Sequence, residues 1–153
     1  MSDKIRNLCI ACAEGDFKRV KDLIGQGAKV NFGDPYHGKS ALFYATAHNR
    51  ADVVRYLLED EGAVAGKREA FWLACEKGFV DCVKHFLHNG VDVVQTYRGV
   101  TFLGVAANFG QEKVIEVLLE NSESSQHATR EATQIACNRG HVGCVQLLHS
   151  FGK

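Results

Sequence analysis

The chain has 153 residues, 46% of them hydrophobic and 24% charged, which is the composition of a globular domain and excludes a disordered tail. It has 18 basic and 18 acidic side chains, so its formal net charge is zero. A neutral chain is a poor candidate for binding the phosphate backbone of nucleic acids or an anionic membrane surface, and we expect neither partner.

The first residues of the chain show no targeting signal. No basic segment followed by an apolar core is present there, and no apolar run is long enough to cross a bilayer. We therefore expect a protein of the cytoplasm, or alternatively of the nucleus, where cysteines stay reduced.

One sequence pattern recurs five times, about every 30 residues. Each copy has an alanine, a glycine or asparagine four residues later, and an apolar residue or pair at twelve and thirteen residues after the alanine. The alanines are Ala11, Ala45, Ala74, Ala106 and Ala136, and the residues four positions later are Gly15, Asn49, Gly78, Gly110 and Gly140. Such a pattern is typical of a stack of small helical units.

Each copy predicts two short helices. In the first helix, the residue just before the alanine and the residue three before it are mostly apolar, so we expect both, including Leu8 and Ile10, in a buried stripe. The glycine position calls for a left-handed backbone, which glycine adopts freely and asparagine tolerates. The second helix buries residues such as Val54 and Leu57. A further glycine ends the unit at Gly27, Gly62, Gly90 and Gly152.

These helical pairs resemble ankyrin repeats. The motifs that carry the resemblance are Ser40-Ala41-Leu42-Phe43-Tyr44-Ala45, Thr101-Phe102-Leu103-Gly104-Val105-Ala106-Ala107, Gly140-His141 and the segment 23–31. The resemblance implies an all-α ankyrin-repeat solenoid of about five helix-turn-helix units, joined by short β-turn or hairpin connectors. We expect a single domain over residues 1–153, with units at about 3–32, 33–65, 66–94, 95–125 and 126–153.

The fifth copy differs from the others in polarity. Thr133, Gln134 and His149 occupy positions that are mostly apolar elsewhere, which is expected of an end unit without an outer neighbour. A small array that ends here is the favoured interpretation, and a piece of a longer array is the alternative.

The cysteines follow the repeat. Those one or eight residues after the alanine share their positions with small or medium-sized residues of other copies, and they are Cys12, Cys75, Cys82, Cys137 and Cys144. We expect them to pack in the core as small hydrophobes, with a metal or redox role as the weaker alternative. Cys9 lies at a variable position and is the thiol that we expect to be accessible.

The sequence contains no pattern of a catalytic or metal site. Cys9 and Cys12 form the only CxxC and lack a second ligand pair, while His85 and His88 lie outside any metalloprotease motif. No phosphate-binding loop and no nucleophile elbow occur. We therefore expect no enzyme, no catalytic residue, no metal and no cofactor.

The first and third connectors are the longest, and each contains a tyrosine. They place Tyr36 with His37, and Tyr97 with Arg98, at loop tips. Tyrosine and arginine often dominate interfaces, so we expect these residues to contact a partner, with solvated turn tips as the alternative.

In the ankyrin family, partners usually contact the loop tips and the variable positions of the first helix. The positions that match here are Trp72, Glu76, Lys77, Asn108 and Phe109. We hypothesise that Trp72, Tyr97 and Phe109 form one patch.

The resemblance implies a non-catalytic scaffold or adaptor, which we expect to be a monomer that binds another protein on its concave face and loop tips. A regulatory or inhibitory subunit of an enzyme is an alternative. Another is a substrate for modification, because a dioxygenase hydroxylates the loop asparagine of some ankyrin repeats and Asn31 matches that position. The corresponding residue of the third unit is Val94.

Overall fold

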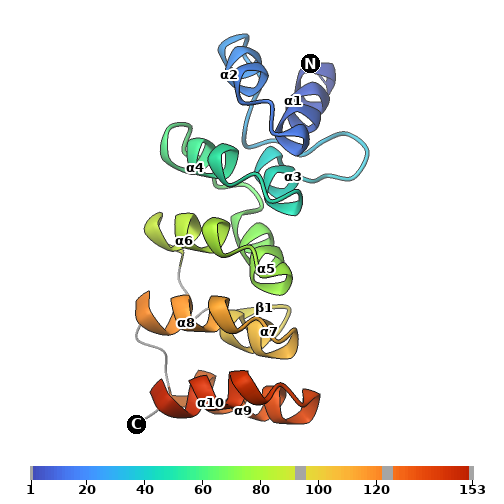
Figure 1. Cartoon of the computed structure of the whole chain (residues 1–153). Helices are drawn as coiled ribbons and strands as arrows, with labels where there is room; N and C mark the ends of the chain where they lie inside the picture. The colour runs from blue at the N-terminus through green and yellow to red at the C-terminus, as the bar shows by residue number, and fades with distance from the viewer. Residues whose placement is uncertain (1, 92–95, 122–125, 152–153) are drawn as a thin grey trace. The chain divides into compact units, whose positions relative to one another are not determined.

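The computed structural model describes residues 2–91, 96–121 and 126–151 (Figure 1). Within these ranges the protein is all-α as predicted, with ten helices arranged in sequential pairs and one short β-hairpin. Two of the predicted positions, Val94 and Gly152, lie outside the described residues. The chain divides into two compact units, residues 1–71 and 72–153, and the division falls within one helix.

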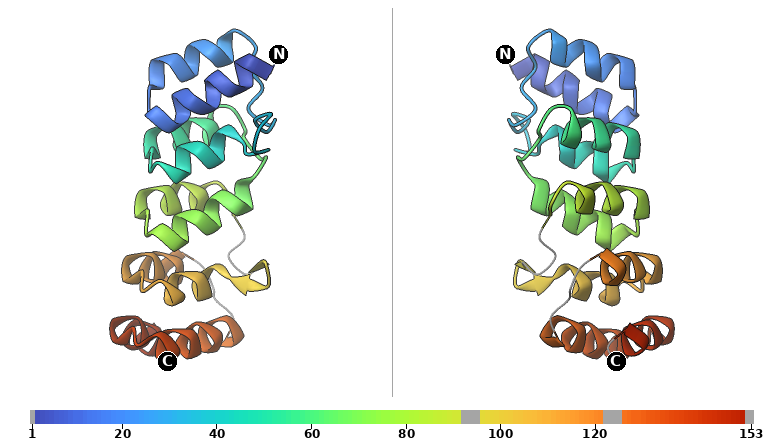
Figure 2. Two further views of the ribbon diagram at one scale, coloured as in Figure 1. Left: turned by 90° about the vertical axis from the view of Figure 1, so that its right-hand side faces the viewer. Right: turned by 90° about the vertical axis from the view of Figure 1, so that its left-hand side faces the viewer.

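The first unit contains two helical hairpins. Helix α1 (Ser2–Glu14) packs against α2 (Phe17–Gly25), and α3 (Ala41–Ala47) packs against α4 (Ala51–Glu59). Because α1 also packs along α3 and α2 along α4, the first helices of the hairpins form one layer and the second helices the other (Figure 2). The start of α5 (Lys67–Lys77) completes this unit.

The second unit repeats the arrangement. After the end of α5 it contains α6 (Val80–His88), α7 (Phe102–Asn108), α8 (Glu112–Asn121), α9 (Gln126–Arg139) and α10 (Val142–Phe151). Helix α7 packs along α9, and α8 packs against both α6 and α10. The first and second helices of successive pairs therefore again lie in separate layers.

A β-hairpin leads into α7 and projects from it (Figure 2). Its strands, β1 (Thr96–Tyr97) and β2 (Val100–Thr101), pair antiparallel. The two residues of the tip, Arg98 and Gly99, have φ values of 56° and 78°. Positive φ at both positions is what a type I′ turn requires.

The predicted left-handed positions are confirmed in all five hairpins. Gly15, Asn49, Gly78, Gly110 and Gly140 have φ values of 74°, 56°, 75°, 69° and 77°. The side chain of the following residue reaches back to the preceding hairpin in three cases. Arg50 Nε donates a hydrogen bond to the backbone carbonyl oxygen of Ala13 (2.9 Å), and Gln111 Nε2 donates one to that of Glu76 (2.9 Å). His141 Nε2 lies 3.1 Å from the backbone carbonyl oxygen of Asn108.

We expect Gly110→Ala to destabilise the protein more than Gly140→Ala. Both substitutions force a side chain into positive φ, at a cost of about 1–2 kcal/mol. A Cβ at Gly110 would also lie 3.0 Å from two ring atoms of His141, whereas nothing lies within 4 Å of one at Gly140. Urea unfolding of the two variants measures the difference, and equal losses would show that the His141 contact contributes nothing.

The predicted core is confirmed at most positions, but the residue before the alanine is less buried than expected in four of the five copies, Val105 being the buried exception. Leu8, Ala11, Val54 and Leu57 are fully buried. Ile10, expected in the same stripe, is 38% exposed, and the equivalent Tyr44, Leu73 and Ile135 are half-buried. Each residue turns the helix by about 100°, so this position rotates away from the packed face and faces the outer side of the first-helix layer.

Two predictions about cysteines are wrong. Cys9 is only 4% exposed and its Sγ lies 3.9 Å from the carbonyl oxygen of Lys39, because the first connector covers it. Cys137 is exposed, since no described helix covers that side of the last hairpin. The other four thiols are buried as predicted. Burial raises the pKa of Cys9, Cys12 and Cys82 to about 12.

These differences predict selective thiol labelling. We expect brief treatment of the native protein with a maleimide to add one label, at Cys137, because the buried thiols are both covered and protonated. Intact-mass measurement counts the adducts. Cys137→Ser should abolish the fast adduct and Cys9→Ser should leave it, whereas a fast second adduct on the wild type would contradict the burial of the other five.

Candidate functional site

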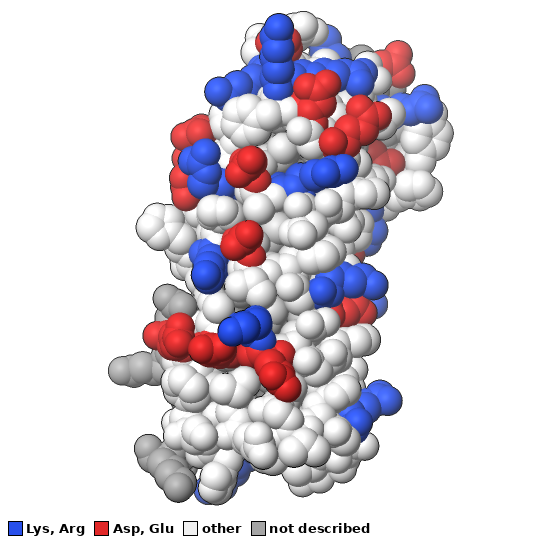
Figure 3. All heavy atoms as spheres, in the orientation of Figure 1, with Lys and Arg blue, Asp and Glu red and all other residues white. Residues whose placement is uncertain are grey.

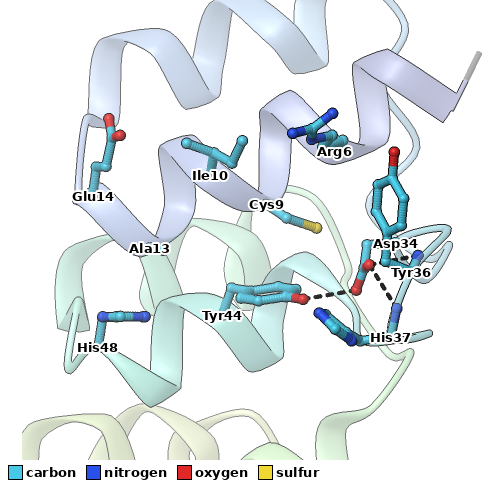
Figure 4. Close-up of a pocket in the computed structure, with 10 residues that line it drawn as sticks. All are labelled: Arg6, Cys9, Ile10, Ala13, Glu14, Asp34, Tyr36, His37, Tyr44 and His48. Atoms are coloured by element: carbon cyan, nitrogen blue, oxygen red, sulfur yellow. Dashed lines mark hydrogen bonds between the residues drawn. The ribbon is translucent and has the colours of Figure 1, made fainter.

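A pocket of about 670 Å³ lies on the first-helix layer of the first unit, beside the long connector (Figure 4). Arg6, Ile10 and Glu14 are each four residues apart on α1, which places them on one helix face. The connector adds Tyr36 and His37, two of the predicted binding residues. Further lining residues are Cys9, Ala13, Asp34, Tyr44 and His48.

The connector is held by the carboxylate of Asp34, which is only 6% exposed. Its Oδ1 accepts hydrogen bonds from the backbone N–H groups of Tyr36 and His37, both at 2.9 Å. Its Oδ2 accepts from Lys39 N (3.1 Å) and from the hydroxyl of Tyr44 (2.8 Å). This one side chain therefore fixes the loop on α3 and presents Tyr36 and His37 at its tip.

These contacts set the ionisation of the cluster. Burial by itself raises the pKa of Asp34, but the hydrogen bonds from His37, Tyr44, Tyr36 and Lys39 outweigh it and hold the pKa at about 2. Burial and the bond to Asp34 raise the pKa of Tyr44 to about 12. Asp34 is thus ionised at neutral pH, but its oxygens are already occupied by groups of the protein.

The two ends of the pocket differ in charge. Figure 4 shows Arg6 and Tyr36 at one end and Glu14 and His48 at the other, with Ile10 between them. The Arg6 guanidinium lies 5.4 Å from the centre of the Tyr36 ring, and Tyr36 is 70% exposed. Among the described residues, no carboxylate lies within ion-pair distance of Arg6.

In the second unit, three of the predicted binding residues come together. The rings of Trp72 and Tyr97 are 5.9 Å apart at an interplanar angle of 53°, and Arg98 lies 5.4 Å from the centre of the Tyr97 ring. Trp72 and Tyr97 are half-buried and Arg98 is exposed. The β-hairpin thus forms a small aromatic and cationic cluster with α5.

Phe109 is exposed but lies apart from the β-hairpin. It follows the last residue of α7, whereas the hairpin joins the first. The seven residues of α7 separate the two ends by roughly 10 Å. The structure therefore brings together Trp72 and Tyr97 and places the third member of the hypothetical patch one helix length away.

The remaining predicted residues take part in joining hairpins or lie exposed. The carbonyl oxygen of Glu76 accepts from Gln111, and Asn108 accepts from His141 through its carbonyl and from Arg139 Nε (2.8 Å) through its side chain. Lys77 is exposed at the end of α5.

Asn31 fixes the loop before α5. Its Oδ1 accepts hydrogen bonds from the backbone N–H groups of Val64 (2.8 Å) and Ala65 (3.1 Å), while the residue stays exposed.

The sequence analysis missed Arg6, Ile10, Asp34 and Tyr44 as pocket residues. The spacing of Arg6, Ile10 and Glu14 was a usable signal, since it predicts a shared helix face. The hydrogen bond between Asp34 and Tyr44 depends on the path of an irregular loop, which no periodic pattern indicates.

The other surfaces of the described residues show no candidate catalytic or metal site. Acidic side chains gather over α8 (Figure 3), where Glu116 pairs with Lys113 at 3.7 Å. No group of three His, Cys, Asp or Glu side chains among the described residues could hold a metal ion. None of the described helices combines the length and apolarity needed to cross a membrane.

Paired short helices, left-handed helix ends and side chains that reach back to the preceding pair define a helical-repeat protein. The family described as ankyrin repeats (3 copies) matches residues 8–97 and, overlapping, residues 60–129. These matches cover more than half of the chain, which therefore belongs to the ankyrin-repeat family.

Three curated proteins are similar to parts of the chain. A palmitoyltransferase AKR1 of Debaryomyces hansenii is 35% identical over 66 residues, which are 42% of this chain. A palmitoyltransferase AKR1 of Lachancea kluyveri is 30% identical over 109 residues (65%), and an ankyrin repeat and KH domain-containing protein of Caenorhabditis briggsae is 29% identical over 124 residues (74%). The chain spans only 8%, 14% and 5% of these relatives, in that order.

Proposed function

We propose that this protein is a non-catalytic scaffold or adaptor that binds another protein through the outer side of its first helices and its connecting loops. Membership of the ankyrin-repeat family supports this proposal, since ankyrin repeats generally mediate protein-protein interaction. The observation that carries it furthest is the cluster of Trp72, Tyr97 and Arg98 at the β-hairpin.

This cluster has the properties of an interface centre. Tryptophan, tyrosine and arginine supply most of the binding energy in many interfaces. Tryptophan and tyrosine do so because they bury a large area with only two rotatable bonds. Here a two-residue turn and the ring contact with Trp72 hold Tyr97 in place before any partner binds. A pre-formed surface loses little conformational entropy on association.

Affinity capture from cell lysate, compared by quantitative mass spectrometry, tests the proposal. We expect the double variant Tyr97→Ala, Phe109→Ala to lose proteins that the wild type retains. Val142→Ala together with Phe151→Ala removes comparable exposed apolar side chains elsewhere in the second unit and serves as the control. Retrieval of the same proteins in equal amounts by all three forms would overturn the proposed surface.

The similarity to the palmitoyltransferases does not lead us to propose acyl transfer. It covers 8% and 14% of those proteins, and the matched part of this chain consists of ankyrin repeats. We propose that the property shared with them is partner recognition. Regulation or inhibition of an enzyme remains an alternative outcome of such recognition.

Modification of Asn31 is a second candidate role. The two hydrogen bonds to its carboxamide oxygen fix the side chain of an exposed residue in one orientation, which would present its Cβ to a hydroxylating enzyme reproducibly. Peptide mass spectrometry of the protein from its native cells tests this role. A mass increase of one oxygen atom on the peptide containing Asn31 supports it, and an unmodified peptide leaves the binding role alone.

We also propose that the protein is a monomer in the cytoplasm or the nucleus. The six free cysteines support a reducing compartment.

A further inference from the structure

We propose that the α1 groove, the pocket lined by Arg6, Ile10, Glu14, Tyr36, His37 and Tyr44, binds an extended peptide segment of another protein with a defined charge pattern. The segment carries an acidic residue, an apolar residue two positions away and a basic residue two positions further. This inference rests on the proposed function, because it names the kind of partner that one surface of the module fits.

The end of the groove at Arg6 selects an acidic side chain. Asp34 is a buried carboxylate of the same pocket, but its two oxygens are occupied by three backbone N–H groups and the Tyr44 hydroxyl. The Arg6 guanidinium lies 5.4 Å from the centre of the Tyr36 ring, and a cation–π contact of this kind uses none of its N–H donors, so they can bind a carboxylate. The exposed His37 lies at the same end.

The middle of the groove is apolar and accessible. Ile10 is 38% exposed, and the half-buried Tyr44 and Ala13 lie beside it in the lining. An apolar side chain placed over Ile10 would remove this surface from water, which is favourable by roughly 25 cal/mol per Å². A volume of about 670 Å³ is within the range of pockets that enclose a small ligand, and it suffices for the side chains of a short segment.

The end at Glu14 selects a basic side chain. The Glu14 side chain is 59% exposed, and its recorded ionic contact is Arg19 at 4.0 Å, at the outer limit of an ion pair. His48 lies at the same end of the pocket, just after the last residue of α3 (Figure 4). A lysine or arginine of the peptide can therefore approach the carboxylate from the groove.

The spacing of the pattern follows from the geometry of α1. Arg6, Ile10 and Glu14 are successive residues of one helix face, each four residues and hence about 6 Å apart along the axis. An extended peptide advances about 6.6 Å over two residues, so its alternate side chains match these three positions in register. Because alternate side chains of an extended chain point to the same side, all three can face the groove together.

Binding of fluorescent peptides to the full chain tests the inference. The probes are heptapeptide pools with the fixed pattern Asp-x-Leu-x-Lys, in both chain directions, and two control pools, Lys-x-Leu-x-Lys and Asp-x-Ser-x-Lys. We expect the wild type to bind the first pattern, in one direction, at least about tenfold more tightly than either control. Equal binding of the patterned and control pools, or no binding of the patterned pool, would overturn the inference.

Charge reversal at Arg6 tests the assignment of the acidic end. We expect Arg6→Glu to lose the preference for Asp-x-Leu-x-Lys and to prefer Lys-x-Leu-x-Lys. Lys18→Glu makes the same change of net charge at an exposed position of α2 and should bind as the wild type does. Unchanged selectivity of a folded Arg6→Glu, with an unaltered circular dichroism melting curve, would refute the groove as the site.

The two proposals fail in different ways. If the peptides show no selectivity but partner capture still depends on Tyr97 and Phe109, peptide binding in the α1 groove is refuted and the proposed function as an interaction module stands. Peptide selectivity that depends on Arg6, together with capture that is indifferent to Tyr97 and Phe109, supports the groove and overturns the β-hairpin surface.

Discussion

Replacing Leu57 by alanine is expected to lower the free energy of unfolding by about 2–5 kcal/mol. Leu57 is fully buried in α4, a helix that packs against both α3 and α2. The substitution removes the transfer energy of three buried carbons and leaves a cavity that the two-layer arrangement can fill only in part. Chemical denaturation followed by far-UV circular dichroism measures the loss.

Leu23→Ala is the matched control for this prediction. Leu23 occupies the same repeat position in α2 but is half-buried, so its truncation should cost clearly less than that of Leu57. Similar losses for the two variants, or a loss at Leu57 below about 1 kcal/mol, would mean that the register of the second helices is wrong.

The repeat pattern is sufficient to predict the helical pairs because its physical requirements recur. A left-handed residue is needed wherever a first helix ends, and this requirement identifies Asn49 as well as the four glycines. A buried apolar residue is needed where the second helix meets its neighbours, as at Leu57. The sequence shows both requirements five times, so neighbouring copies support each other.

The repeat pattern cannot predict the burial of a residue whose surroundings differ from those of the equivalent residues in other copies. Cys137 occupies a column that is buried in the other copies, yet it is exposed because its hairpin has no described neighbour on that side. Cys9 is buried for the opposite reason, since the first connector covers it. A periodic pattern reports the average environment of a column and carries no information about what covers one member.

The residues of the candidate site also fall into those that the sequence predicts and those that it does not. Tyr36, His37, Tyr97 and Arg98 were predictable as loop tips because turn residues and connector length indicate where a chain leaves its helices. The charge of the α1 groove was not predictable. It depends on Asp34 being occupied within its own loop, which leaves Arg6 as the exposed charge.

Replacing Asp34 by asparagine is expected to lower the free energy of unfolding by about 1.5–3 kcal/mol at neutral pH. An amide can keep one oxygen for the N–H groups of Tyr36 and His37. Its nitrogen cannot accept a bond from the N–H of Lys39, so that contact is lost and the bond with the Tyr44 hydroxyl is reversed or broken. Urea unfolding of the wild type and the variant measures the loss.

The difference between wild type and Asp34→Asn is also expected to depend on pH. The folded protein holds the pKa of Asp34 at about 2, below its ordinary value of 3.8, so the ionised carboxylate stabilises the fold at every pH above about 4. As the pH falls from 4 to 2, the unfolded chain takes up a proton before the folded one does, and this stabilisation is lost.

The unfolding free energies of the wild type and Asp34→Asn should therefore converge between pH 4 and pH 2, because the asparagine does not titrate. Asp22→Asn makes the same change of charge at an exposed position of α2 and serves as the control for the change of net charge. A constant difference between wild type and Asp34→Asn from pH 7 to pH 2 would mean that the carboxylate does not hold the connector, and that Tyr36 and His37 are not fixed at the edge of the α1 groove.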